Sequence, residues 1–250
     1  MSSMKTAIKH FLRRLGWQLG RVVPPGPGIP VGMAELGMEA TFTALRHRGF
    51  MPNVVVDVGA ARGQFTTDLL PIWPRSRYLL IEPLTEWHPA LEHLCQSHPS
   101  VEYVQGAAGA RPGTATIHIP TSLEGSSLFQ QEGESRNVPL YTVDDLLSHR
   151  GLTVDLLKID VQGYERFVLQ GATLSLRECA FVLLECQFYR FGPEMIQVHE
   201  TVAYMAESGF IPYEIAGILR RPIDGAMGQC DILFCRKDHP YFRETRWADS

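Results

Sequence analysis

Three acidic residues stand close to the ends of buried, strand-like segments, and they are well placed to do chemistry. Asp57 lies in an apolar β-branched run, and Glu82 and Asp160 each come at the end of a similar run. A carboxylate at such a position can accept hydrogen bonds from hydroxyl groups or attract a cationic group. Because ligands of parallel sheets bind at the carboxyl ends of the strands, we expect these three acids and Ala107 to share one rim.

The turn that follows Asp57 contains Gly59 and Gly63. A side chain at either glycine would block a ligand that lies against the backbone. The helix expected next, which stops at Pro71, would direct its first N–H groups toward that ligand. An ordinary strand–turn–helix connection looks the same, and a glycine motif alone is not specific.

The spacing of the acids and glycines restricts the ligand. Glu82 comes about 25 residues after Asp57, where a carboxylate binds ribose hydroxyls; capping of the next helix is the alternative. A dinucleotide site would have G-x-G-x-x-G, whereas this chain has G-x-x-x-G preceded by an acid. A carboxylate repels the negative charge of a pyrophosphate and attracts a cationic amino group. A ligand with an ammonium group, a ribose and no phosphate fits, and S-adenosylmethionine (SAM) is such a ligand.

Composition restricts the class of protein. The chain has 250 residues, of which 45% are hydrophobic and 20% charged, and its net charge is −4. These values predict one α/β domain with a real core and argue against a nucleic-acid partner. Five cysteines without a C-x-x-C pair indicate buried, reduced thiols and no zinc site. No apolar run reaches the roughly 18 residues of a membrane span, and no signal peptide is visible, so we expect a cytoplasmic protein.

The first 30 residues differ from the rest. Residues 1–23 carry several basic and no acidic side chains, and apolar residues recur at helical spacing. This pattern predicts a basic amphipathic helix that docks on the domain or on a second subunit, as in a homo-oligomer; an anionic membrane surface or another partner is the alternative. A Pro/Gly linker follows at 24–30. We therefore divide the chain into residues 1–30 and a domain of residues 31–250.

Buried strands alternate with helices along this domain, which predicts an α/β fold with a Rossmann-like, doubly wound, mostly parallel sheet. Two final strands joined by a polar hairpin indicate an antiparallel C-terminal edge. The expected strands are 53–58, 78–82, 101–104, 115–119, 138–143, 154–161, 181–186, 211–219 and 231–235. The expected helices are 33–48, 66–70, 86–96, 144–149, 164–176 and 198–208. A polar loop is expected at 120–137.

Six motifs of this domain resemble the FkbM family of SAM-dependent methyltransferases. In order they are DVGAARGQF, LLIEP, VQGAAG, VPLYTVDDLL, LLKIDVQGYERFVLQGA and FVLLE, and the similarity covers about residues 45–215. The KIDVQGYE segment is the most specific part, whereas the glycine motif would match any class I methyltransferase. The resemblance implies the seven-stranded methyltransferase fold, SAM as cofactor, and transfer of a methyl group to a hydroxyl.

The resemblance also implies a cofactor site. Its residues would be Asp57, Gly59, Ala60 and Gly63 along the methionine and ribose, Glu82 on the ribose hydroxyls, and Gly106 and Ala107 near the adenine. We add Ser126, because the loop that contains it is where we expect a lid over the acceptor.

For catalysis, the resemblance places Asp160 facing the methyl sulfonium and the acceptor. It is our first candidate for the base that removes the hydroxyl proton, followed by Glu165, Glu185 and His118. Capping of the turn at Gly163 is the alternative role for Asp160. Glu185, unless functional, should pair with Lys158 or an arginine, because an unpaired buried carboxylate is costly.

One departure from the family pattern affects this assignment. Gln162 stands where the family usually has Glu, in KIDVEGYE. Any base or metal-binding role of that acid would fall to Asp160 or Glu165, or be lost. Asp160 and Glu185 together could hold Mg²⁺, but we do not favour this and assign no metal ligand.

The expected acceptor is a hydroxyl of a small molecule or glycan, such as a sugar or natural product. Amino-group methyltransferases often carry Asn/Asp-Pro-Pro-Tyr/Phe where this chain has Asp-Val-Gln-Gly at 160–163, so N-methylation is disfavoured. A nicotinamide-dependent oxidoreductase and a non-catalytic binding module that retains this fold remain as alternatives.

Overall fold

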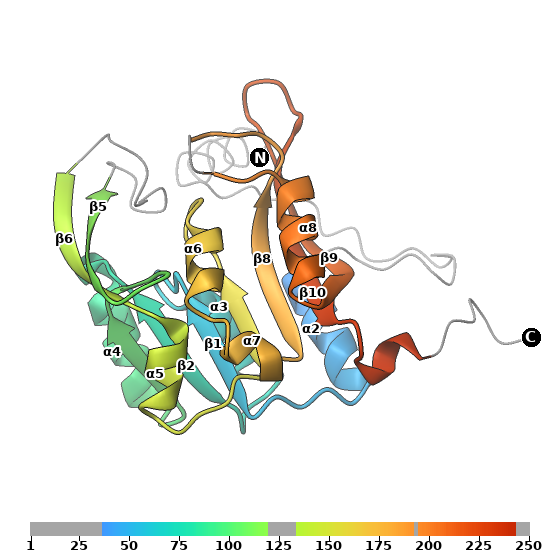
Figure 1. Ribbon diagram of the computed structural model, residues 1–250. Helices are drawn as coiled ribbons and strands as arrows, with labels where there is room; N and C mark the ends of the chain where they lie inside the picture. The colour runs from blue at the N-terminus through green and yellow to red at the C-terminus, as the bar shows by residue number, and fades with distance from the viewer. Residues whose placement is uncertain (1–36, 120–133, 193–194, 244–250) are drawn as a thin grey trace, which may run out of the picture. The chain divides into compact units, whose positions relative to one another are not determined.

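The computed structural model describes residues 37–119, 134–192 and 195–243 (Figure 1). These ranges contain the predicted α/β body. The expected N-terminal helix and linker of residues 1–30, and Ser126 in the 120–137 loop, lie outside the described residues.

A seven-stranded sheet forms the centre of the body, with the order β3-β2-β1-β7-β8-β10-β9. The first five strands are parallel, and β10 runs antiparallel to both of its neighbours. The predicted sheet with its antiparallel C-terminal edge is therefore confirmed. The strands are β1 (Val54–Val58), β2 (Arg77–Glu82), β3 (Val101–Gln105), β7 (Leu156–Ile159), β8 (Phe181–Gln187), β9 (Phe210–Arg220) and β10 (Met227–Arg236).

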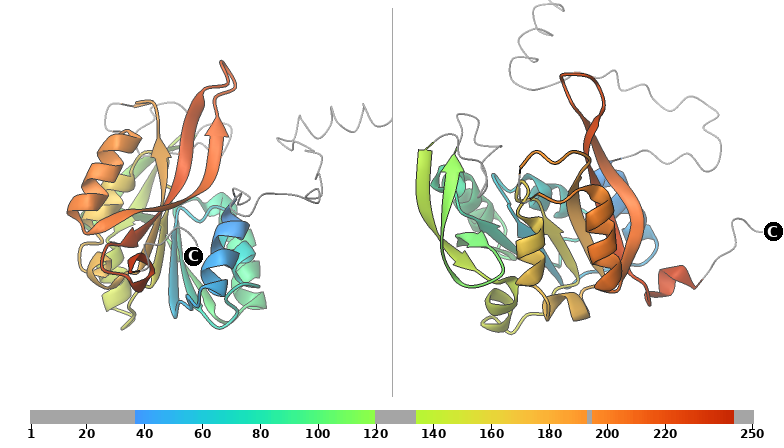
Figure 2. Two further views of the ribbon diagram at one scale, coloured as in Figure 1. Left: turned by 90° about the vertical axis from the view of Figure 1, so that its right-hand side faces the viewer. Right: turned by 45° about the horizontal axis from the view of Figure 1, so that its top comes forward.

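Helices cover both faces of this sheet (Figure 2). Phe42, Leu69 and Leu91 pack on one face, and Leu146 and Met205 belong to the core on the other. Strands β1, β7 and β8 are buried along their whole length, as expected for continuous apolar runs between two helical layers. The first layer holds α2 (Met38–His47), α3 (Gln64–Leu69) and α4 (His88–Ser97); the second holds α5 (Val143–Ser148), α6 (Glu165–Gln170), α7 (Ser175–Glu178) and α8 (Val198–Glu207).

A second, three-stranded sheet was not predicted. It has the order β4-β6-β5, from β4 (Ala107–Ala108), β5 (Gly113–Ile119) and β6 (Glu134–Tyr141). Strand β6 begins inside the segment that we expected to be loop. The start of β6 is polar and largely exposed, and its strand conformation comes from antiparallel pairing with β5, which residue types alone do not reveal.

The single helix expected at 164–176 is also wrong, because the chain breaks between α6 and α7. A Cβ atom on Gly171 would lie 2.0 Å from the carbonyl oxygen of Gly109, so the chain packs closely there. Asp144 then accepts hydrogen bonds from the backbone N–H groups of Leu174 and Ser175 at 2.9 and 2.8 Å, which starts α7.

The cysteines agree with the prediction of reduced thiols. All five are free, and four of them are buried while Cys95 is half-buried. No helix in the described ranges combines the length and the apolar character needed to cross a membrane.

Candidate functional site

The turns that follow β1, β2 and β7 meet at the carboxyl edge of the sheet, as predicted. The N–H of Gly59 donates to the carbonyl of Ile81 at 3.0 Å, and the N–H of Asp160 donates to that of Val58 at 3.1 Å. The N–H of Gly106 donates to the carbonyl of Glu82 at 3.1 Å. Backbone hydrogen bonds thus hold the predicted site segments together on one rim.

The glycines of the first turn are required by the packing of the protein itself. Gly59 has φ +75°, and a Cβ atom there would lie 1.8 Å from the carbonyl oxygen of Asp160. Gly63 has φ +81°, and its Cβ would lie 2.8 Å from a methyl group of Leu94. We expected these glycines to leave room for a ligand, but the atoms that a side chain would meet belong to the chain.

Asp57 is completely buried and forms an ion pair within the sheet. The ammonium of Lys158 lies 3.0 Å from Oδ1, although Oδ1 accepts no well-aligned hydrogen bond from a described residue, and Thr66 donates to Oδ2 at 3.0 Å. The same ammonium donates to the carbonyl of Gly59 at 2.8 Å. Asp57 therefore influences the glycine turn through Lys158. Burial lowers the pKa of Lys158, but the charges of Asp57 and Asp160 outweigh it and raise the pKa.

Glu82 joins the turn after β1 to the segment after β2. Its Oε2 accepts from the N–H of Ala61 at 2.7 Å, and its Oε1 accepts from the N–H of Leu84 at 2.9 Å. Burial raises the pKa of Glu82 to about 7, although both N–H groups oppose this shift. A carboxylate has about four lone-pair positions, so two remain to accept hydrogen bonds from a ligand.

Asp160 is the most accessible acid at the rim, with 34% of its side chain exposed. Gln162 donates from Nε2 to Oδ1 at 3.1 Å, and Lys158 lies 3.8 Å from Oδ2. Gln162 has φ +54°, and Ala61 has φ +47°; among the described residues, no other non-glycine residue has a positive φ. Strained backbone of this kind concentrates at functional sites, and here it lies in two turns of one rim.

Glu165 holds the turn that follows β7. Its Oε1 accepts hydrogen bonds from the backbone N–H groups of Val161 and Gly163, at 3.1 and 3.0 Å. Burial raises the pKa of Glu165 to about 7. The capping of this turn, which was the alternative considered for Asp160, is thus done by Glu165, and a catalytic role for Glu165 stays a prediction.

Glu185 has amide partners, and in the described part of the chain it forms no ion pair with Lys158 or an arginine, which was the alternative to a functional role. Gln187 donates to Oε2 at 2.8 Å, and Gln229 donates to Oε1. Burial and the neighbouring charge of Asp160 raise the pKa of Glu185 above its ordinary value. Sequence reasoning did not identify these two glutamines as partners of Glu185. Each lies two residues from an acid on its own strand, Gln187 from Glu185 and Gln229 from Asp231.

The other predicted residues have the following places. Ala60 and Ala107 are buried. A Cβ on Gly106 would lie 2.6 Å from the ring of Tyr141, so this glycine too serves internal packing. His118 contacts Ser135 across the β5–β6 pair at 3.1 Å. Within the described ranges, no group of three His, Cys, Asp or Glu side chains could hold a metal ion.

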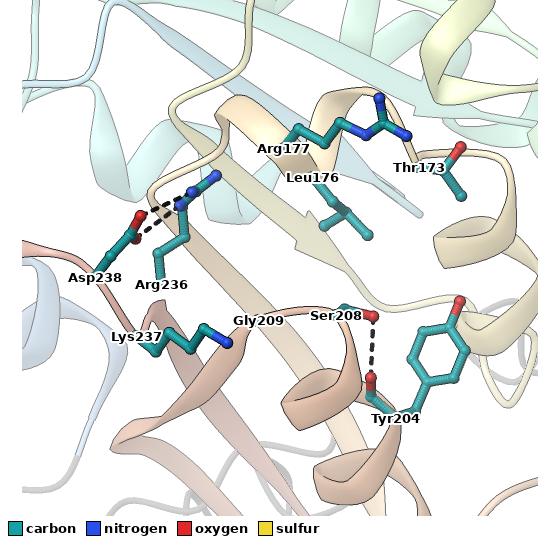
Figure 3. Close-up of a pocket in the computed structure, with 9 residues that line it drawn as sticks. All are labelled: Thr173, Leu176, Arg177, Tyr204, Ser208, Gly209, Arg236, Lys237 and Asp238. Atoms are coloured by element: carbon teal, nitrogen blue, oxygen red, sulfur yellow. Dashed lines mark hydrogen bonds and ion pairs between the residues drawn. The ribbon is translucent and has the colours of Figure 1, made fainter.

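A separate cavity of about 330 Å³ lies where α7, the end of α8 and the end of β10 meet (Figure 3). Arg236 and Asp238 form a two-point ion pair on its wall, at 3.0 and 3.1 Å. Because the antiparallel end of β10 pairs with the start of β8, this cavity is at the amino ends of the parallel strands. It contains none of the predicted site residues.

Comparison with solved structures returns several methyltransferases. The chain is similar to methyltransferase FkbM from Methylobacillus flagellatus KT, at 15% identity over 81% of this chain and 48% of that chain, with a TM-score of 0.49. It thus spans about half the length of that protein. It is also similar to precorrin-6y C5,15-methyltransferase from Geobacter metallireducens GS-15, at 13% identity over 78% and 86% of the two chains, with a TM-score of 0.44.

A third similar structure is the 1,6-didemethyltoxoflavin-N1-methyltransferase from Burkholderia thailandensis, determined with bound S-adenosylhomocysteine. The identity is 14% over 80% of this chain and 79% of that chain, with a TM-score of 0.41. Among curated proteins, none matches this chain. The family model of the methyltransferase FkbM domain matches residues 57–212, more than half of the chain and the whole rim from Asp57 to Glu185. The chain therefore belongs to the FkbM methyltransferase family.

Proposed function

We propose that this protein transfers a methyl group from SAM to a hydroxyl group of a small molecule or glycan. The observation that carries the proposal is the pair of acids on the rim. Glu82 has two lone-pair positions left to accept hydrogen bonds from a ligand. Asp160 is partly exposed and accepts a hydrogen bond from Gln162.

The N–H groups of the first turn support SAM over a dinucleotide. Those of Gly59 and Ala60 donate to Ile81, that of Ala61 donates to Glu82, and that of Gly63 donates back to Ala60. A pyrophosphate needs free N–H groups at such a turn. A ligand whose ribose contacts a carboxylate and whose other end is cationic does not need free N–H groups at this turn. The hydrogen-bonded turn therefore disfavours a nicotinamide-dependent oxidoreductase.

The residues of the rim fit SAM by charge and by hydrogen-bonding capacity. Glu82 would accept hydrogen bonds from the ribose hydroxyls, and Asp160 would lie near the cationic end. When bound, SAM supplies an electrophilic methyl group on a sulfonium. Lys158 keeps the glycine turn and Asp160 in place, because its ammonium contacts the carbonyl of Gly59 and lies 3.8 Å from Asp160.

Asp160 is the group best suited to take the proton of the acceptor hydroxyl. Its Oδ1 accepts from Gln162, which leaves Oδ2 for the proton. Glu165 is less suited because its Oε1 already holds two backbone N–H groups, and Glu185 is less suited because its strongly raised pKa disfavours the ionised form. A base that works at neutral pH must be ionised before the reaction.

The test is a titration of the protein with SAM and with NAD, followed by methyl-transfer assays on sugars, glycolipids and hydroxylated metabolites, with and without EDTA. We expect binding of SAM only. Glu82→Gln should weaken SAM binding about tenfold. Asp160→Asn should change SAM binding less than about twofold and lower turnover at least about 100-fold.

The exposed Glu207 of α8 offers a control, and Glu207→Gln should change neither quantity. Failure of the protein to bind SAM at saturating concentration would refute the proposal. Full turnover by Asp160→Asn would refute only the role of Asp160.

A further inference from the structure

Four polar side chains form two rungs at the ends of β8 and β10. Glu185 lies opposite Asp231, and Gln187 lies opposite Gln229 in the antiparallel register. Residues two apart on a strand face the same side, so all four lie on one face of the sheet. A Cβ on Gly217 would lie 2.3 Å from Oδ2 of Asp231, so this glycine of β9 gives the carboxylate its room.

The amide oxygen of Gln187 finds no donor in the part of the chain that the structure describes. Gln187 is the last residue of β8 and is only 4% exposed. Its Nε2 donates to Glu185, but its Oε1 receives no hydrogen bond from any residue in the described ranges. A buried acceptor without a donor is unfavourable and rare, and this one is at the edge where ligands of such sheets bind.

The charges around Gln187 indicate which donor fits. Asp160, Glu185 and Asp231 are neighbours, because Asp160 and Asp231 each raise the pKa of Glu185 and burial with Asp160 raises that of Asp231 to about 6. The only cation among their interacting groups in the described structure is Lys158, whose ammonium lies 3.0 Å from Asp57. The raised pKa of Glu185 favours its neutral form, so the carboxyl groups of Asp160 and Asp231 are the ones that repel an anionic ligand and favour a cationic hydrogen-bond donor.

We propose that Gln187 and Asp231 bind the ammonium group of an acceptor that also carries the hydroxyl to be methylated, as in an amino sugar or an amino alcohol. This inference rests on the proposed methyl transfer and adds the class of its acceptor. The N–H groups of the ammonium donate to Oε1 of Gln187 and to the carboxylate of Asp231. Glu185 and Gln229 position Gln187 and complete the wall. Asp160 follows the neighbouring strand β7, so the hydroxyl and the amine of one small molecule can reach both groups.

The test uses matched pairs of small molecules, titrated into protein saturated with S-adenosylhomocysteine. The pairs are glucosamine with glucose and ethanolamine with ethylene glycol, and glucuronate is the anionic probe. We expect at least one amine to bind at least tenfold more tightly than its hydroxyl counterpart, and glucuronate to bind most weakly.

Two variants connect this preference to the two rungs. Gln187→Met and Asp231→Asn should each remove most of the preference for the amine, while S-adenosylhomocysteine binding stays within about twofold. Glu207→Gln is the surface control.

The outcomes separate the two proposals. Absence of S-adenosylhomocysteine binding contradicts the proposed function. Binding of S-adenosylhomocysteine without any preference for an amine, or with an equal preference in both variants, overturns the acceptor inference alone.

Discussion

Replacing Lys158 by methionine should destabilise the protein strongly. Lys158 and Asp57 are both almost completely buried, and their charged atoms are 3.0 Å apart. Methionine has a similar length but no charge, so Lys158→Met leaves the carboxylate of Asp57 in the core with, among the described residues, only the hydroxyl of Thr66 as a hydrogen-bond donor. It also removes the hydrogen bond to the carbonyl of Gly59.

The expected loss follows from the burial of this ion pair. Removing one partner of a buried pair costs about 3–5 kcal/mol of unfolding free energy, because the other charge remains uncompensated. For a domain of this size, about 1 kcal/mol corresponds to about 2–4 °C, so the melting temperature should fall by about 6–20 °C. Removing both charges is far less costly, and Lys158→Met/Asp57→Asn should be at least about 2 kcal/mol more stable than Lys158→Met.

The assay is urea unfolding of the wild type, both single variants and the double variant, analysed as a double-mutant cycle. Arg190→Met is the control, because Arg190 forms an exposed ion pair with Glu200 at 2.7 Å and should cost less than about 1 kcal/mol. A loss below about 1 kcal/mol for Lys158→Met, or additive losses in the double variant, would show that the buried pair does not have the assigned effect.

Two further predictions concern the rim. Gly59→Ala should cost several kcal/mol more than Gly49→Ala, because both glycines have positive φ but only Gly59 would meet a backbone oxygen, at 1.8 Å; equal losses in thermal melts would contradict this. The pKa of Glu185 is raised in the folded state, so its protonation favours folding below the ordinary pKa of 4.5, and this contribution declines as the pH rises toward the raised pKa. The stability of the wild type relative to Glu185→Gln should therefore fall as the pH rises above about 4.5, and denaturant titrations at several pH values that show a constant difference would refute the shift.

Local sequence patterns were sufficient for the main sheet and for the rim. Continuous apolar runs such as Val54–Val58 specify strands buried on both faces, and parallel strands bring their carboxyl ends to one edge. The sequence therefore predicted correctly that Asp57, Glu82 and Asp160 lie along one edge of the sheet. The cap of α5 also involves residues close in sequence, because Thr142 accepts from the N–H of Asp145 at 3.0 Å.

Partners distant in sequence could not be read from the sequence. The pairing of Lys158 with Asp57 depends on two strands being in register, and no local pattern states which buried acid a buried lysine will meet. The amide partners of Glu185 come from its own strand and from β10, forty-four residues later. The break before α7 depends on a close approach of Gly171 to Gly109.

The hydrogen-bonded turn after β1 has a consequence for how the proposed cofactor would bind. Because the N–H groups of residues 59–61 and 63 are already hydrogen-bonded within the chain, we expect this turn to keep the same form when a ligand binds. Binding there needs no ordering of a loop, so little conformational entropy is lost and the encounter resembles docking to a rigid surface. A slow conformational change during catalysis would then occur in segments other than this turn.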